Sequence, residues 1–399
     1  MKKVFYIGNF SFPYGNASGS RVLGNGLVLR EIGYQVYYIG VDESIRSDQK
    51  LEDTLSIYKE FSYYNLPYPK KKSDWLSYKK RFREVERLLD KNNPDLIILY
   101  GSPTISIFCK LILNWARKNN TICLSDCVDW LNSGTGSIIY RTIKYLDNSY
   151  QKRIFNKQTD GVIAISTYLT DYYKKEKLTT ITIPPLIDPD KYKNLTYKHE
   201  GDTKIKLIYV GQPFATDGRK VKETSFKDRL DKVINILNLL EEYDFEFNVY
   251  GITKNEYLKV IPKQKVKIEN LSEKIFFHGK IKNNDAIKKI SESHFTILFR
   301  DVNRMTSAGF PTKFVESISC GTPIITTNTS DIEDYLKEGV NGYFIDTFDQ
   351  TKCLEKMKFI FSLNFSEIEK MKSLCKNSLM FGHNNFVEDF RHFMGVITK

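Results

Sequence analysis

Short runs of β-branched and aromatic residues alternate with longer amphipathic stretches through the first half of this chain. Runs of strand length lie at residues 4–7, 35–39, 96–100, 121–124, 161–165 and 180–183. Between the first two runs, residues 21–32 have the length and apolar spacing of a helix. Strands that alternate with helices are typical of a parallel sheet covered on both faces. The first half therefore predicts a doubly wound α/β domain.

The alternation restarts after a polar segment at residues 194–204. Strand-like runs follow at residues 206–211, 246–251, 275–279, 295–299 and 323–326. This repeat of the pattern predicts a second parallel-sheet domain. The expected division is a first domain at 1–198, a second domain at 199–378, and a helix at 379–399 that either stands alone or packs back on the first domain.

Two helices are predicted in the tail of the chain. Ser366 and Glu369 have the spacing of a capping box, which places a helix start at Ser366. Further on, aromatic and aliphatic residues recur at helical spacing: Phe386, Phe390, Phe393, Met394 and Ile397.

Length and composition agree with two domains, because 399 residues with 41% hydrophobic content exceed one ordinary core. No run approaches the roughly 20 apolar residues of a membrane span, and the N-terminus lacks the apolar segment of a signal peptide, so we expect a cytoplasmic protein. Six cysteines without CxxC spacing predict reduced core residues rather than a metal site or disulfides. A net charge of +12 indicates an anionic partner: nucleic acid, a phosphate-bearing substrate or acidic lipid.

Open α/β sheets bind ligands beyond the carboxyl ends of their strands, which directs attention to four loops. The first, at 8–21, is rich in glycine and serine and precedes a helix, where backbone N–H groups can approach an anion. Gly15 and Gly19 lie four residues apart, so the loop lacks the dinucleotide fingerprint and argues against a nicotinamide dehydrogenase. The alternative is a flexible loop with a helix cap at Ser18 or Ser20.

The second and third loops contain glycines at strand ends and nearby cations. Gly211 ends one strand, and Lys227 precedes the next helix, where it either neutralises a phosphate or is an ordinary surface charge. His278 and Gly279 end a later strand, and Arg300 ends the one after it. Glycine there permits close approach of a planar base, while an ordinary turn is the alternative.

The fourth loop, at 308–316, is the most informative. Gly309 and Pro311 open a helix whose first turn exposes N–H groups, and Glu316 follows one turn later. A diphosphate at the helix start and ribose hydroxyls at the carboxylate would form a nucleotide site.

With these residues, the whole chain resembles family 4 glycosyltransferases, particularly those of bacterial capsular and O-antigen polysaccharide assembly. The strongest match is residues 309–324, which look like the family's glutamate, seven residues and glutamate, followed by a small-Cys-Gly-Thr-Pro turn. Weaker matches occur in the family's order at 15–21, 160–166, 227–228 and 277–279.

The resemblance implies a GT-B fold, in which two Rossmann-like doubly wound domains face each other across a cleft. It implies a retaining, metal-independent transfer of a hexose-type sugar from a nucleotide-diphosphate donor, expected to be a UDP-sugar, with no other cofactor. The acceptor would be a glycan or a polyprenyl-diphosphate-linked sugar. By position, Glu316 would bind the ribose, Lys227 the diphosphate, the backbone of 310–313 the phosphates and sugar, and Gly19 would admit the diphosphate from the first domain.

Two departures from the family concern the donor. Ala308 occupies the place of the first glutamate, which usually contacts the donor sugar. Gln212 stands where an arginine often helps to hold the diphosphate. The insertion at 214–226, with Arg219, Lys220 and Lys222, is a candidate source of that charge.

A third departure concerns the acceptor, since all five histidines lie at or beyond the domain boundary: His199, His278, His294, His383 and His392. The first-domain histidine of many relatives is missing, and Asp126 or Asp129 is its nearest substitute. Either carboxylate could orient an acceptor hydroxyl, or serve as a helix cap or surface charge. We favour Asp126, which is nearer the predicted strand end.

The candidate site residues form two sets. The catalytic set is Asp126, Asp129 and Glu316. The nucleotide-sugar set is Gly15, Ser18, Gly19, Arg21, Gly211, Gln212, Lys227, His278, Gly279, Arg300, Gly309, Phe310, Pro311, Thr312, Lys313 and Glu316. No metal ligands are expected.

Residues 70–91 form a predicted basic amphipathic helix. Its apolar positions are Trp75, Tyr78, Phe82, Val85 and Leu89, beside seven basic residues. This stripe either packs on the first-domain core or docks on anionic membrane carrying a lipid-linked acceptor. Two other functions remain open, a nucleotide-sugar epimerase of the same fold and a non-enzymatic nucleic-acid-binding protein. The second has no helix-turn-helix, zinc or RNP-like motif in its favour, so no nucleic-acid partner is expected.

Overall fold

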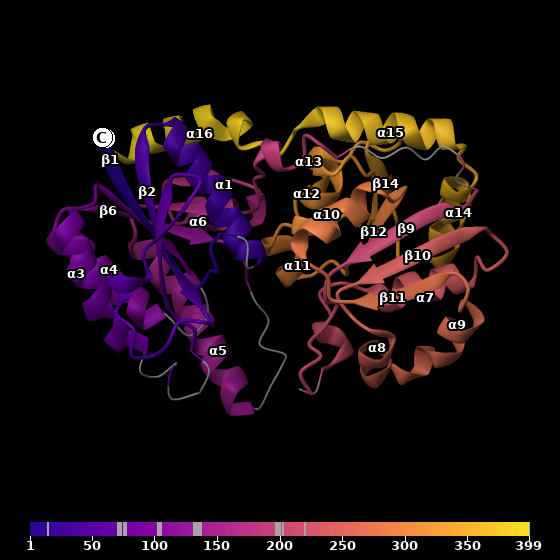
Figure 1. Ribbon diagram of the computed structural model, residues 1–399, viewed down its shortest axis with the longest axis horizontal. Coiled ribbons are helices and arrows are strands. Elements are labelled where there is room, and N and C mark those ends of the chain that lie inside the picture. The colour runs from indigo at the N-terminus through magenta and orange to yellow at the C-terminus, as the bar shows by residue number, and fades with distance from the viewer. Residues whose placement is uncertain are drawn as a thin grey trace. The chain divides into compact units, whose positions relative to one another are not determined.

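The computed structural model (Figure 1) describes residues 1–13, 16–69, 74, 78–101, 106–130, 138–195, 201, 203–218 and 221–398. The described chain forms two compact units. The first contains the residues up to Asp188 together with those from Phe381 onward, and the second contains Pro189–Met380. The division therefore falls earlier than the boundary expected after residue 198, and the C-terminal helix is part of the first unit.

The first unit is built on an eight-stranded sheet in the order β3-β4-β2-β1-β5-β6-β7-β8. Its strands are β1 Lys2–Gly8, β2 Tyr34–Asp42, β3 Ser56–Tyr58, β4 Phe61–Pro67, β5 Leu96–Tyr100, β6 Ile122–Cys127, β7 Gly161–Ala164 and β8 Thr180–Thr182. Its α-helices are α1 Ala17–Glu31, α3 Phe82–Asn92, α4 Ser106–Lys118, α5 Ile138–Tyr150, α6 Thr167–Lys175 and α16 Val387–Ile397. All neighbouring strands are parallel except β3 and β4, which are antiparallel.

The second unit has a six-stranded sheet in the order β11-β10-β9-β12-β13-β14, and every neighbouring pair is parallel. Its strands are β9 Ile205–Val210, β10 Phe245–Tyr250, β11 Ile275–Gly279, β12 Phe295–Leu298, β13 Ile324–Thr326 and β14 Gly342–Phe344. Its α-helices are α7 Leu230–Asn238, α8 Lys254–Val260, α9 Lys265–Asn270, α10 Asn283–Ser291, α11 Arg304–Ala308, α12 Thr312–Ser319, α13 Ile332–Tyr335, α14 Gln350–Phe361 and α15 Phe365–Ser378. The expected doubly wound parallel sheets are thus confirmed. The strand order reverses between β9 and β12, where such sheets bind ligands.

The apolar stripe of the predicted basic helix packs on the core of the first unit. Tyr78 lies in a short 3-10 helix that leads into α3, and its side chain is buried with Val85 and Leu89 among the strands' side chains. Phe82 is partly buried against the same core. This stripe is therefore not available to a membrane, while residues 70–73 and 75–77, including Trp75, lie outside the described residues. Among the helices of the described chain, none is long and apolar enough to cross a bilayer.

Helix α15 begins earlier than its capping-box pattern predicts. Its N-cap is Asn364, whose side chain accepts a hydrogen bond from the Glu367 backbone N–H at 2.9 Å. The Glu367 carboxylate in turn accepts from the Asn364 N–H at 3.0 Å. The prediction of a cap at Ser366 is therefore wrong, because Asn364 and Glu367 satisfy the same spacing two residues earlier.

Replacing Asn364 by Ala should lower the free energy of unfolding by about 1 kcal/mol, because an orphaned first-turn N–H loses its acceptor. Urea denaturation followed by circular dichroism measures this. Ser366→Ala is the matched control and should leave the denaturation midpoint unchanged, since Ser366 lies past the cap. A larger loss in the Ser366 variant would contradict the assignment.

Candidate functional site

A buried carboxylate lies where the strand order of the second sheet reverses. Asp228 is 2% exposed, and its oxygens accept hydrogen bonds from Arg300 Nε at 2.8 Å, Lys313 Nζ at 2.7 Å and the Tyr209 hydroxyl at 2.8 Å. Burial pushes the pKa of Asp228 upward, but Lys313 and Arg300 outweigh it and hold the pKa well below its ordinary value. One carboxylate thus fixes two cations from different segments of the chain.

Glycine at the end of β9 makes room for one of these cations. Gly211 has a φ of 141°, and a Cβ at this position would lie 2.5 Å from Lys313 Cε. The Lys313 side chain therefore crosses the Gly211 backbone to reach Asp228. At the end of β11, Gly279 has a φ of 71°, and its carbonyl accepts from the Gly251 N–H at 2.7 Å. Gly279 thus forms a strand-end turn.

Helix α12 begins beside this cluster without a side-chain cap. Its N-cap is Pro311, which has no side-chain hydrogen bond to the first-turn amides. Thr312 and Lys313 form the first turn, preceded by Gly309 in an extended conformation. The Phe310 ring is buried against Phe314 and Tyr335, so Phe310 can offer a ligand only its backbone. Uncapped first-turn N–H groups attract anions.

Glu316 lies one turn further along α12. Within the described residues its carboxylate has no hydrogen bond or ion pair, although Lys313 and Lys191 are near enough to interact electrostatically. Burial raises the pKa of Glu316, and the two lysines oppose that rise. A desolvated carboxylate without a protein donor can accept hydrogen bonds from ligand hydroxyls.

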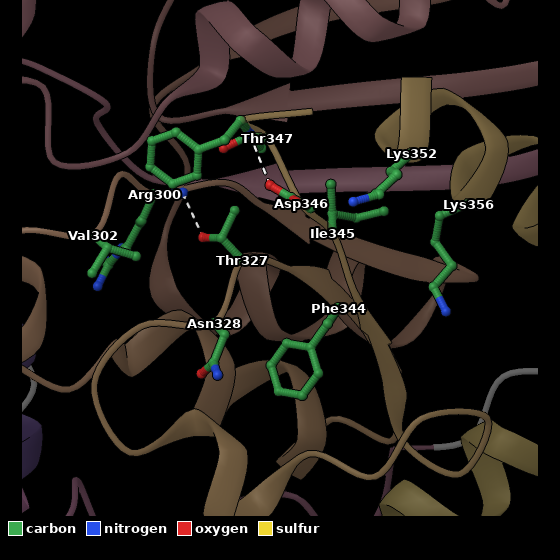
Figure 2. Close-up of a pocket in the computed structure, with 11 residues that line it drawn as sticks. Arg300, Val302, Thr327, Asn328, Phe344, Ile345, Asp346, Thr347, Lys352 and Lys356 are labelled. Carbon is green, nitrogen blue, oxygen red and sulfur yellow. Dashed lines mark hydrogen bonds between the residues drawn. The ribbon is translucent and has the colours of Figure 1, made fainter. Parts of the chain in front are cut away.

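A cavity of about 430 Å³ adjoins the cluster at the carboxyl ends of β12, β13 and β14. Figure 2 shows Lys352 and Lys356 of α14 on one side of it and Arg300 on the other. The Arg300 N–H donates to Thr327 Oγ1 at 2.9 Å, while its buried Nη1 has no hydrogen-bond partner in the described chain. Cavities of this size hold small ligands. Its other lining residues are Val302, Asn328, Phe344, Ile345, Asp346, Thr347 and Phe348.

Other residues expected at the donor site lie apart from the Asp228 cluster. The exposed Gln212 donates to Thr216 Oγ1 at 3.3 Å. His278 stacks on Tyr250 at 4.3 Å, and its Nε2 lies 2.6 Å from Asn248 Oδ1 on the face of the sheet. Burial lowers the pKa of His278.

Lys227 directly precedes Asp228 and is half-buried, but the ammonium that hydrogen-bonds Asp228 is that of Lys313. From the sequence, Lys313 is expected at the donor site through its backbone, but the diphosphate is assigned to Lys227 and the Asp228 side chain has no role. In the insertion, Arg219 and Lys220 lie outside the described residues.

In the first unit, Asp126 is held in a buried ion pair. It is 1% exposed, and its oxygens accept from Arg21 Nη2 at 2.7 Å, Arg21 Nε at 3.0 Å and the Tyr6 hydroxyl at 2.5 Å. Strand β6 continues to Cys127, past the predicted strand end, so Asp126 lies within the sheet. Two predicted site residues, Asp126 and Arg21, thus neutralise each other. Asp129 follows the strand end and is half-buried.

The loop before α1 is shaped by close backbone packing. The N-cap of α1 is Asn16, whose side chain accepts from the Gly19 N–H at 2.9 Å, so neither Ser18 nor Ser20 is the cap. A Cβ at Gly19 would lie 2.1 Å from the Ser11 carbonyl oxygen. Close packing against this backbone therefore accounts for a glycine at position 19. Gly15 lies outside the described residues.

Several solved structures have the same two-sheet fold over nearly the whole chain. The catalytic domain of starch synthase IV from Arabidopsis thaliana, bound to ADP and acarbose, matches with a TM-score of 0.69 and 12% identity over 100% of both chains. Sucrose-phosphate synthase from Thermosynechococcus elongatus matches with a TM-score of 0.68 and 12% identity over 100% of this chain and 99% of that one. HepE from Anabaena, in complex with UDP and glucose, matches with a TM-score of 0.65 and 11% identity over 99% of this chain and 100% of that one. The fold is therefore GT-B.

Residues 202–378, which lie within the second unit, match the family described as Glycosyl transferases group 1. The second unit therefore contains a glycosyl transferases group 1 domain, as the motif at 309–324 predicts, in a chain with the GT-B fold. It is also 22% identical over 217 residues to an uncharacterized 41.2 kDa protein in the cps region of Klebsiella pneumoniae. That alignment covers 52% of this chain and 54% of the relative, so the chain spans about half the length of that relative.

Replacing Asp126 by Asn should destabilise the first unit by about 3–5 kcal/mol, because the buried Arg21 loses its counter-charge. All three tryptophans, Trp75, Trp115 and Trp130, are in this half of the sequence, so tryptophan fluorescence during urea denaturation monitors it selectively.

Asp48→Asn is the matched control for Asp126→Asn. Its ion pair with Arg46 is equally short, at 2.7 Å, but both side chains are largely exposed. We expect no change in its denaturation midpoint. Equal effects of the two substitutions would show that the buried pair has no special importance.

Proposed function

We propose that this enzyme transfers a hexose-type sugar from a nucleotide-diphosphate donor, expected to be a UDP-sugar, to a glycan or polyprenyl-diphosphate-linked acceptor in polysaccharide assembly, with retention of anomeric configuration. The observation that carries the proposal is the grouping of Lys313 and Arg300 at the uncapped start of α12, with Glu316 one turn later. Two cations, the first-turn amides of Thr312 and Lys313, and a carboxylate match the diphosphate and ribose of one ligand.

The diphosphate is the leaving group, so its developing charge is what the site must stabilise. Lys313 and the first-turn amides of α12 provide preorganised positive charge for it. Asp228 holds Lys313 and Arg300 in place without being exposed itself. Losing one preorganised donor of this kind typically costs about 3 kcal/mol of barrier.

Glu316 is proposed to bind the ribose hydroxyls. Its carboxylate has no hydrogen bond within the described chain and is close enough to Lys313 for the two to interact electrostatically. A ligand whose phosphates meet the helix start would bring its ribose one turn further along the helix. The base would then approach the strand-end turns at Gly251 and Gly279, where the glycines themselves have no side chain.

The acceptor is proposed to bind at the strand ends of the first unit. Asp129 follows β6 and is half-buried, so its carboxylate can orient an acceptor hydroxyl. In a retaining transfer, the acceptor attacks from the face that the nucleotide leaves, and a phosphate oxygen takes the proton. This division of roles needs no general base on the second unit.

The relatives support the donor class and the pathway. HepE is described in complex with UDP-glucose, and starch synthase IV bound to ADP, so proteins of this fold bind nucleotide diphosphates. The Klebsiella relative is named for a cps region, which supports a role in polysaccharide assembly.

A panel of nucleotide sugars should identify the donor, because a ligand that binds the native state raises the melting temperature by mass action. We expect UDP-glucose or another UDP-sugar to raise it. Lys313→Ala should weaken binding of that donor by roughly ten- to a hundredfold, through loss of a charge-assisted hydrogen bond. Calorimetric titration measures the affinity.

Lys265→Ala is the control for Lys313→Ala, because Lys265 is exposed on α9 of the same unit. Its affinity for the donor should equal that of the wild type. Product analysis with and without a glycan acceptor then separates transfer from epimerisation, which needs the donor alone. A panel in which no nucleotide sugar shifts the melting temperature would refute the proposed function.

The affinity for UDP-glucose should fall as the pH is lowered toward 5. Burial raises the pKa of Glu316, so this carboxylate protonates at a higher pH than an ordinary glutamate and loses acceptor strength there. UDP-glucose suits the measurement because its diphosphate is a diester without a titration near pH 6. In Glu316→Gln the affinity should be weaker and flat over the same range, with lower turnover. A wild-type profile that stays flat would remove Glu316 from the ribose site.

A further inference from the structure

The outer face of α5 in the first unit exposes an unusual number of large apolar side chains. Ile138 is 79% exposed, Leu146 60%, Tyr145 51% and Ile143 47%. Single exposed apolar residues are common on soluble proteins, but a contiguous group indicates a binding surface. Figure 1 shows α5 extending beyond the strands of this unit, at the bottom of the view.

Three of these side chains lie in one stripe along the helix, and Ile143 lies further round it. Ile138, Tyr145 and Leu146 are separated by seven and eight residues, which places them on the same side of an α-helix. Another side of the helix attaches it to the unit, because Asn148 is buried. Tyr150, one turn after Leu146, packs against the core cluster at the edge of the stripe. The apolar stripe therefore faces away from the core.

The neighbouring segments enlarge the apolar surface. The N-terminus of α4 lies beside α5, where Ser106 Oγ donates to the Asp147 carbonyl at 3.4 Å, and the next residue, Ile107, is 64% exposed. Beyond α5, Ile154 is 48% exposed. We call the exposed side chains of Ile107, Ile138, Ile143, Tyr145, Leu146 and Ile154 the α5 face.

The charges beside the α5 face are mainly positive. Residues 138–155 contain four basic residues, Arg141, Lys144, Lys152 and Arg153, and one acidic residue, Asp147. Lys152 is buried, whereas Arg153 is exposed and Arg141 and Lys144 are half-buried. A helix with an apolar stripe, a tyrosine and basic flanks has the composition of a segment that lies at the surface of an anionic bilayer.

We propose that the α5 face docks this enzyme on an anionic lipid bilayer. The membrane contact is thereby assigned to α5 instead of residues 70–91, whose described apolar side chains are buried in the core. Helix α5 follows β6, so the face lies on the unit whose strand end carries Asp129. The link to a lipid-linked acceptor rests on the proposed function, but binding to lipid itself does not.

Sedimentation with lipid vesicles tests the proposal. The full chain should sediment with vesicles of phosphatidylglycerol and phosphatidylcholine and stay in solution with phosphatidylcholine alone. The double variant Ile138→Glu/Leu146→Glu should lose at least about tenfold in apparent affinity for the anionic vesicles, because it places charge in the apolar stripe. Ile57→Glu is the matched control, since Ile57 is 73% exposed on β3 of the same unit, and it should bind as the wild type does.

Three results would overturn the proposal: a wild type that ignores anionic vesicles, a double variant that binds them equally well, or a wild-type dimer in gel filtration that the double variant dissociates. The last would assign the face to a second copy of the chain. The melting-temperature shift with the nucleotide-sugar donor should be the same in both variants as in the wild type. That measurement shows that the variants are folded and keeps failure of membrane docking distinct from failure of the proposed donor site.

Discussion

The second unit depends on one constraint, which is that two cations at the ends of its strands must be held close together. Arg300 and Lys313 would repel each other if left alone, and Arg300 is almost fully buried. Asp228 removes the repulsion by accepting from both, and Gly211 leaves the space that Lys313 needs. The start of α12, the strand end of β12 and the segment before α7 are thereby fixed with respect to one another. A preorganised positive site follows from that arrangement.

Each unit contains a buried carboxylate paired with arginine, but the balance of charge differs between them. In the first unit, Arg21 and Asp126 also form a buried pair, but there one cation meets one carboxylate, and their remaining hydrogen bonds go to the Ile183 carbonyl and the Tyr6 hydroxyl. In the second unit a single carboxylate serves two cations, so positive charge remains for a ligand. This difference agrees with the proposal that the second unit binds the donor and the first unit the acceptor.

Most of the fold was predictable, because each sheet is built from alternating apolar and amphipathic segments. The β3–β4 hairpin was missed since its turn residues, Lys59 and Glu60, have positive φ without the Asn-Gly or Asp-Gly sequence that signals such turns. Of the site, the start of α12 and Glu316 could be read from local sequence, whereas the partners of Asp228 lie 72 and 85 residues away and meet only through the topology. The spacing of apolar residues also did not show that α3 buries its apolar stripe whereas α5 exposes its own. Both helices have apolar residues at helical spacing, and only the position of the core distinguishes them.

Arg300 belongs to two sites at once. Its Nε is committed to Asp228, while the residue also lines the cavity formed by the ends of β12, β13 and β14. A guanidinium is planar and rigid, so the hydrogen bond from Nε to Asp228 also fixes how Arg300 is oriented beside the cavity. One side chain therefore sets both the positive charge of the Asp228 cluster and part of the cavity wall, and a substitution of Arg300 would alter the two together.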